Sequence, residues 1–199
     1  MIGNFVLGAG CSWGDNCLQV PAGAFALSEN PLTPATDGSY SVSVCFKLNT
    51  LSNSAPIICQ AAKYTTLDAN DRFCLYMNGT NIQLYIKTRG NNTSTSYRKG
   101  IAANNILVAG NKYVVDIVVD GANRVVYMYV NGLLVGSATG YNYTAWDCTL
   151  PVGLNCLSKT TSANASMDYY AINIYDRALT AEEVETNFRA YNSRFNLGL

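Results

Sequence analysis

Three aromatic rings and a carboxylate gather in one short, turn-rich segment, residues 141–147. These side chains belong to Tyr141, Tyr143, Trp146 and Asp147. Flat amphipathic rings beside hydrogen-bonding groups suit the binding of sugars or protein partners. The same rings also suit a structural role in which Trp146 closes one end of the core. We therefore interpret the segment as a candidate ligand-binding site, with structural packing as the alternative.

A second polar segment, residues 88–99, combines local positive charge with many hydrogen-bonding groups and little to bury. Connecting loops lie at the surface and often carry function. The residues that could contact a neighbouring subunit are Arg89, Asn91, Asn92, Tyr97 and Arg98. We interpret the segment first as a loop that faces solvent, with subunit contact through these residues as the sharper alternative.

The sequence offers little for catalysis, and we predict that the protein is not an enzyme. It contains no histidine, which removes the commonest general base and the usual catalytic triads. A glycosidase needs two carboxylates about 5 to 10 Å apart around the scissile bond. The densest acidic group, Glu182, Glu183 and Glu185, is instead explained as the first turn of a helix. No catalytic residue is assigned.

Metal and cofactor binding are not expected. The oxygen-rich stretch Asp68-Ala69-Asn70-Asp71 lacks the ligand count of a calcium loop and is typical of a turn. Seven cysteines cannot all pair, and none forms a C-x-x-C unit. We expect them to be mainly free, buried thiols.

Composition indicates one all-β domain, residues 1–199. Thirteen basic residues balance thirteen acidic ones, so no net field favours nucleic acid or an anionic membrane. The first basic residue is Lys47, so the start of the chain lacks the charged region of a secretory signal. No apolar run reaches transmembrane length. We expect a protein made in the cytosol, without membrane insertion.

Alternating apolar residues predict a series of antiparallel strands. Residues 41–48 alternate strictly, and further strands are expected at 56–60, 72–77, 81–87, 113–119, 124–130 and 133–135. Asn78-Gly79 and Asn131-Gly132 are strong hairpin turns. Such a chain predicts an antiparallel β-sandwich.

One short helix is expected at the C-terminal end. Thr180 and Glu183 have the spacing of a capping box, with Leu179 and Val184 at the positions of a hydrophobic staple. Val184, Phe188, Tyr191 and Phe195 recur near a 3.6-residue period. This apolar stripe predicts a helix that lies on the domain.

The closing segment carries a resemblance to a known family. It joins the strand at 167–175 to an Arg-Ala-Leu turn and the helix start at 177–184. Together with residues 111–121 and 125–132, it resembles the laminin-G-like, concanavalin A-like lectin-glucanase superfamily, of the kind found in tailed-phage virion proteins. The resemblance covers residues 39–195 and implies a jelly-roll β-sandwich with one short C-terminal helix. It also implies that residues 13–21 form the opening edge strand.

Two departures from the family limit what the resemblance implies. Many relatives have a glycine and an acidic pair in the last strand, where this chain has Met167 and Tyr170-Ala171. A metal site is therefore not carried over. The Glu-x-Asp-x-x-Glu strand of glucanase relatives is also missing.

The resemblance implies a structural or binding module on the surface of a bacteriophage virion. Such a head decoration, tail-fibre or adhesin component contacts coat or tail subunits and, as a further partner, host glycans. A homo-oligomer, by analogy a trimer, is expected, located in the virion. The alternative function is a bacterial carbohydrate-binding module, and a glycoside hydrolase is less favoured.

Overall fold

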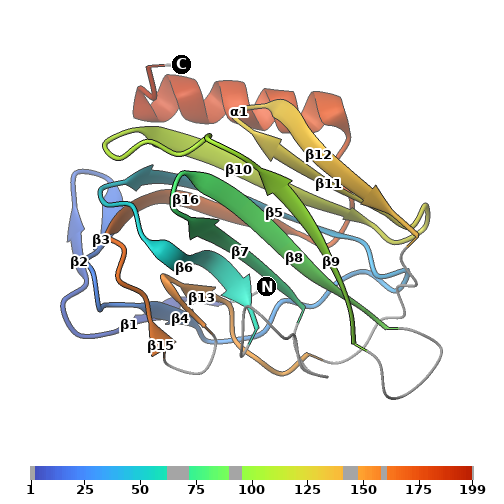
Figure 1. Ribbon diagram of the computed structural model, residues 1–199, viewed down its shortest axis with the longest axis horizontal. Helices are drawn as coiled ribbons and strands as arrows, with labels where there is room; N and C mark the ends of the chain where they lie inside the picture. The colour runs from blue at the N-terminus through green and yellow to red at the C-terminus, as the bar shows by residue number, and fades with distance from the viewer. Residues whose placement is uncertain (1–2, 62–71, 90–95, 141–147, 158–160, 199) are drawn as a thin grey trace.

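The chain folds into two antiparallel seven-stranded sheets packed face to face, with one α-helix on the outside of the second sheet (Figure 1). The computed structural model describes residues 3–61, 72–89, 96–140, 148–157 and 161–198. The predicted all-β sandwich with a C-terminal helix is confirmed.

Seven strands form each large sheet. The first sheet has the order β1 (Phe5–Leu7), β4 (Ala26–Ser28), β13 (Gly153–Leu154), β6 (Asn53–Gln60), β7 (Phe73–Asn78), β8 (Asn81–Arg89) and β9 (Ser96–Ala103). The second sheet has the order β12 (Leu133–Thr139), β11 (Val125–Val130), β10 (Lys112–Asp120), β5 (Tyr40–Leu48), β16 (Met167–Tyr175), β3 (Cys17–Val20) and β2 (Ser12–Gly14). A small third sheet pairs β14 (Cys156–Leu157) with β15 (Thr161–Ser162).

The main core lies between the two large sheets and is filled by every second residue of their strands. Val42, Val44 and Phe46 of β5 are fully buried, as are Ile82 and Leu84 of β8. Each such side chain contributes roughly 1.5 to 3 kcal/mol when it leaves water. The period-two pattern of the sequence therefore marks the inward-facing positions directly.

The two predicted Asn-Gly turns connect neighbouring strands. Gly79 and the pair Asn131 and Gly132 all adopt positive φ angles, 59°, 52° and 78° respectively. Positive φ is inexpensive for glycine and tolerated by asparagine, which explains the residue choice. The turn at Gly79 sets the register of β7 against β8, with Asn78 opposite Asn81.

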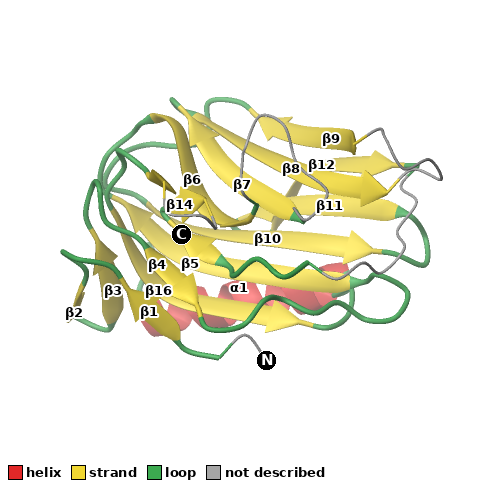
Figure 2. Ribbon diagram, turned by 90° about the horizontal axis from the view of Figure 1, so that it is seen from below, coloured by secondary structure: helices red, strands yellow, loops and turns green. Residues whose placement is uncertain are grey.

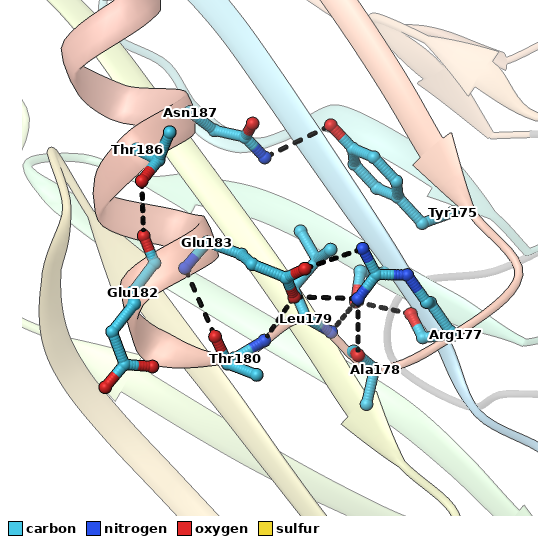
Figure 3. Close-up of polar contacts among 10 residues, drawn as sticks. Tyr175, Arg177, Ala178, Leu179, Thr180, Glu182, Glu183, Thr186 and Asn187 are labelled. Atoms are coloured by element: carbon cyan, nitrogen blue, oxygen red, sulfur yellow. Dashed lines mark hydrogen bonds and ion pairs between the residues drawn. The ribbon is translucent and has the colours of Figure 1, made fainter.

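The helix α1 (Ala181–Phe195) starts at the predicted capping box (Figure 3). Thr180 Oγ1 accepts a hydrogen bond from the backbone N–H of Glu183 at 3.2 Å, and the Glu183 carboxylate accepts one from the backbone N–H of Thr180 at 2.9 Å. The guanidinium of Arg177 donates to both Glu183 oxygens, at 2.7 and 2.8 Å. The strand-to-helix junction is thus locked by its own side chains.

The helix covers the outer face of the second sheet, opposite the main core (Figure 2). Val184 at the start of the helix and Leu179 just before it are buried against Val118 and Tyr129. At its last turns it buries Tyr191, with Cys45 and Val114 in the same cluster. The predicted apolar stripe therefore contacts the sheet and covers part of its outer face.

The opening segment differs from the single edge strand that the resemblance implied. Residues 13–21 do not run straight, because Asp15 and Asn16 adopt positive φ angles of 40° and 63° and reverse the chain. The result is a short hairpin in which β2 pairs with β3, and β2 forms the edge of the second sheet.

All seven cysteines are free thiols, as predicted. Six of them are buried, and Cys11 is half-buried. Cys59 and Cys74 face each other across β6 and β7 without a disulfide. Burial raises the pKa of Cys45 to about 12, so this thiol stays protonated at neutral pH.

Candidate functional site

The outer face of the first sheet carries a compact aromatic and amide cluster on the β7–β8 hairpin. The turn at Gly79 places Tyr76 directly opposite Gln83, and Tyr85 one position further along β8 on the same face. The neighbouring residues on these strands point into the core, so these three side chains point outward. Tyr76 is mostly buried within this face, and Gln83 and Tyr85 are half-buried.

The three side chains are held together by stacking and hydrogen bonds. The rings of Tyr76 and Tyr85 stack with centroids 5.1 Å apart and an interplanar angle of 16°. Their hydroxyl oxygens lie 2.9 Å apart, and both hydroxyls lie within hydrogen-bonding reach of Gln83 Oε1. With its oxygen used in this way, the Gln83 side chain directs its NH₂ group away from the two hydroxyls.

The strand next to this cluster contributes almost no side chain. Gly100 lies opposite Tyr85 and Ala102 lies opposite Gln83, and both are exposed. A Cβ atom at Gly100 would lie 3.0 Å from Cε1 of Tyr85, closer than normal contact. The ring of Tyr85 therefore packs against the backbone of β9 at Gly100, where a side chain would be in its way. We call Tyr76, Gln83, Tyr85, Gly100 and Ala102 the tyrosine face.

None of the site residues predicted from the sequence belongs to the tyrosine face. Several of them lie outside the residues that the structure describes. Tyr141, Tyr143, Trp146 and Asp147 fall in residues 141–147, outside the described residues. Asn91 and Asn92 also lie outside them, as does the stretch Asp68–Asp71.

The remaining candidates were placed in the wrong kind of element. Arg89 ends β8, whereas Tyr97 and Arg98 belong to β9. The two strands pair with Thr88 opposite Tyr97 and Arg89 opposite Ser96. The predicted loop at 88–99 is therefore wrong at both ends, because residues 88–89 and 96–99 form paired strands. Contact of these residues with a neighbouring subunit stays a prediction. Short polar strands lack the apolar alternation that reveals a strand in the sequence.

The tyrosine face itself was missed, although a signal for it exists. Taken as a two-residue turn, Asn78-Gly79 would place Tyr76 opposite Asn81. In the structure the two loop residues are Gly79 and Thr80, and Tyr76 lies opposite Gln83. Strand alternation puts Tyr76, Gln83 and Tyr85 on one face in either register, so the shared face could have been predicted from the sequence, but the pairing could not.

The acidic residues of the helix have structural roles. The pKa of Glu183 is lowered to about 2, chiefly by the hydrogen bonds from Arg177 and also by that from Thr180. Glu185 forms an ion pair with Arg189 at 2.5 Å. Across the described residues, no three His, Cys, Asp or Glu side chains come together in a way that could hold a metal ion.

The carboxyl group of Asp116 has a raised pKa, but it is buried on the face of the second sheet that α1 covers. Asp116 is 1% exposed, and burial raises its pKa to about 6. Ser43 lies directly opposite on β5 and moderates the shift, although its hydroxyl does not reach hydrogen-bond geometry with either carboxylate oxygen. Asp116 sits on the second sheet, so it cannot act at the tyrosine face.

The chain belongs to the concanavalin A-like lectin/glucanases superfamily. The family model of that description matches residues 22–185. This match starts and ends earlier than the 39–195 expected from the sequence. No curated protein sequence matches the chain. Within the described residues, no helix has the length and apolar character to cross a bilayer.

Solved structures of toxin binding domains share the fold. The chain is similar to the receptor binding domain of botulinum neurotoxin D, at 16% identity and a TM-score of 0.71, over 96% of this chain and 48% of that one. The binding domain of Paraclostridial Mosquitocidal Protein 1 gives 14% identity and a TM-score of 0.71, over 95% and 48%. A botulinum neurotoxin serotype D ligand binding domain in complex with N-acetylneuraminic acid gives 14% and 0.65, over 94% and 46%. The chain thus spans about half the length of these domains.

Proposed function

We propose that this protein is a non-catalytic binding module whose tyrosine face contacts a glycan. The observation that carries the proposal is the hydroxyl–amide cluster of Tyr76, Gln83 and Tyr85, in which the Tyr85 ring packs over Gly100. A sugar has apolar C–H faces that stack on aromatic rings and hydroxyl groups that hydrogen-bond to amides and phenols. Gln83 and Tyr85 are only half-buried, so part of each side chain is exposed to a ligand.

The comparisons support a binding role over a catalytic one. The solved structures cited above are binding domains, and one of them holds N-acetylneuraminic acid. Because this chain spans only about half of those domains, glycan binding by this chain rests on the tyrosine face. The only described carboxylate with a raised pKa is Asp116, which lies beneath the helix, out of reach of a substrate at the tyrosine face.

We further propose that the module sits on the surface of a bacteriophage virion, as a head decoration or a tail-fibre component. The support is the resemblance of the closing segment, residues 167–184, to laminin-G-like proteins of tailed-phage virions. Contacts with coat or tail subunits and assembly into a homo-oligomer follow from the same resemblance. A bacterial carbohydrate-binding module is the competing function.

A glycan array tests the binding role. The purified chain is applied to an array that includes sialylated glycans, alongside the variants Tyr85→Ala and Gln83→Ala. We expect either variant to lose about tenfold or more in affinity, since one stacked ring or one amide donor contributes roughly 1 to 2 kcal/mol. The matched control is Tyr127→Ala, which removes a half-buried tyrosine from the second sheet. Equal binding by all four proteins would refute the proposed site.

Particle association tests the virion role separately. A tagged copy of the chain is supplied during particle assembly, and purified particles are assayed for the tag after gradient sedimentation. Co-sedimentation supports the virion role, and a tag that stays with free protein while glycan binding persists supports the bacterial module. Light scattering on the same sample measures the oligomeric state.

A further inference from the structure

One half of the strand β16 has no neighbouring strand on one side. On its first side, β16 pairs with β5 along its whole length, from Met167 to Tyr175. On its second side, it pairs with β3 only at residues 167–169. Within the described part of the chain, no strand pairs with residues 170–175 on that second side. We call this open side of residues 170–175 the β16 edge.

The opening hairpin explains why the edge is open. A longer β3 would continue along β16 toward residue 175. Instead, Asp15 and Asn16 take left-handed conformations immediately before β3 begins. Two successive residues with positive φ form the tight turn that reverses a chain between antiparallel strands. The preceding strand β2 therefore lies on the far side of β3, and β16 is left uncovered beyond residue 169.

The backbone groups that face the open side can be assigned by alternation. The N–H and C=O of Leu48 in β5 bond to Asn111 and Gly110, at the start of β10. Successive residues of an antiparallel strand bond to opposite neighbours. Hence Cys45 and Ser43 of β5 direct their backbone groups toward β16.

The partners of those two residues on β16 are Ala171 and Asn173. By the same alternation, Ile172 and Ile174 direct their N–H and C=O groups away from β5, into the open side. These are two donors and two acceptors in the spacing that an added strand requires.

A hollow of about 650 Å³ runs along this edge. It is lined by Leu32 and Thr33 on one side and by residues 172–176 on the other. Leu32 is buried, and Ile172 and Ile174 are half-buried with their side chains against the core. The hollow thus offers apolar contacts below the edge and backbone hydrogen bonds along it.

The end of the hollow is acidic. Asp176 lines it, is exposed, and forms no ion pair with any described residue. Arg177, the nearest basic residue in sequence, is already held by Glu183. A positive charge on a partner would therefore find Asp176 available.

We propose that the β16 edge binds an extended segment of a partner protein by strand addition. The segment lies antiparallel to β16, spans about six residues or roughly 20 Å, and presents apolar side chains at alternate positions to Leu32, Ile172 and Ile174. A basic residue at its N-terminal end pairs with Asp176. This site is separate from the tyrosine face and does not depend on glycan binding.

Labelled heptapeptides test the proposal. The panel carries an N-terminal lysine followed by valine, isoleucine or leucine alternating with threonine, and binding to the full chain is measured by fluorescence anisotropy. Amide hydrogen exchange is measured on the same samples. We expect the amides of Ile172 and Ile174 to exchange at least tenfold more slowly at saturating peptide. The matched peptide control has the same side chains but N-methyl groups on the edge-facing amides, and it should bind at least tenfold more weakly.

A protein variant tests the charge pair. Asp176→Asn should weaken binding severalfold, and the loss should disappear with a peptide whose lysine is replaced by glutamine. Glu185→Gln, on the exposed side of α1, is the matched control and should bind as the unaltered chain does.

Two results would overturn the proposal. The first is unchanged exchange at Ile172 and Ile174 with every peptide at millimolar concentration, or equal binding of the N-methylated peptides. The second is protection of these amides that grows with protein concentration in the absence of peptide, since a second copy of this chain would then occupy the edge.

Discussion

Replacement of the buried Asp116 by asparagine should change how stability depends on pH. Asp116 lies between the second sheet and α1, 1% exposed, with neither carboxylate oxygen bonded to a described residue. Burial raises its pKa from 3.8 to about 6. A carboxyl whose pKa is higher in the folded state stabilises the fold when protonated, and this contribution is lost as pH rises from about 4 to about 6.

The size of the change in stability follows from the shift in the pKa of Asp116. A difference of roughly two pKa units corresponds to about 3 kcal/mol. The free energy of unfolding of the unaltered chain should therefore fall by about 3 kcal/mol between pH 4 and pH 7 through this group. Asp116→Asn does not titrate, so the variant should gain about that amount relative to the unaltered chain over the same interval.

Urea unfolding of both proteins at pH 4, 5, 6 and 7 measures this difference. The control is Asp15→Asn, which removes an exposed carboxylate in the β2–β3 turn. The difference in free energy of unfolding between this variant and the unaltered chain should not change with pH. Parallel stability curves for Asp116→Asn and the unaltered chain would refute the reasoning, because they would mean that Asp116 is not a buried, titrating carboxyl.

Three further substitutions test the fold. Asn155→Ala should lower the free energy of unfolding by about 2 to 4 kcal/mol, because the buried amide nitrogen donates to carbonyl oxygens of Ala24 and Ala165 at 3.0 and 2.9 Å; an unchanged urea midpoint would contradict this role. Gly132→Ala should lower the melting temperature, because its φ is 78° and a Cβ would lie 2.9 Å from Cδ1 of Phe188; an unaltered melting curve would argue against that packing. Thr180→Ala should cost about 1 kcal/mol in urea unfolding through loss of the helix cap, and a loss below the error of the measurement would show that the cap contributes little.

Much of the fold could be predicted because its signals are local. Strict alternation in residues 41–48 marks β5, and the Asn-Gly pairs mark the turns of two hairpins. The capping residues Thr180 and Glu183 mark the start of the helix to the residue. Each of these signals comes from a residue's own conformational preference or from the side-chain period, so neighbouring residues suffice to read it.

The features of the structure that could not be predicted from the sequence depend on contacts between distant segments. The burial of Asp116 is not visible in the sequence, since it results from α1 packing on β10 some seventy residues earlier in the chain. The open half of β16 likewise follows from a turn at Asp15 and Asn16, at the other end of the chain. The strand β9 and the end of β8 were missed because their polar residues are typical of a loop, although the strand at 81–87 was predicted.

The candidate site combines features that follow from local sequence with features that depend on distant segments. Strand alternation could have placed Tyr76, Gln83 and Tyr85 on one face, whereas their pairing depends on the loop being Gly79-Thr80 and not Asn78-Gly79. That α1 packs on the outer face of the second sheet, and not on the tyrosine face of the first, is known only once the helix is placed.

The central claim, that the tyrosine face binds a glycan, is tested most directly by nuclear magnetic resonance. The strongest glycan from the array is titrated into the ¹⁵N-labelled chain, and the side-chain amide of Gln83 and the backbone amide of Gly100 are followed. We predict that both resonances shift and saturate together with a single affinity, and that Tyr85→Ala abolishes the shifts. Saturable shifts elsewhere, with Gln83 and Gly100 unmoved, would contradict the claim.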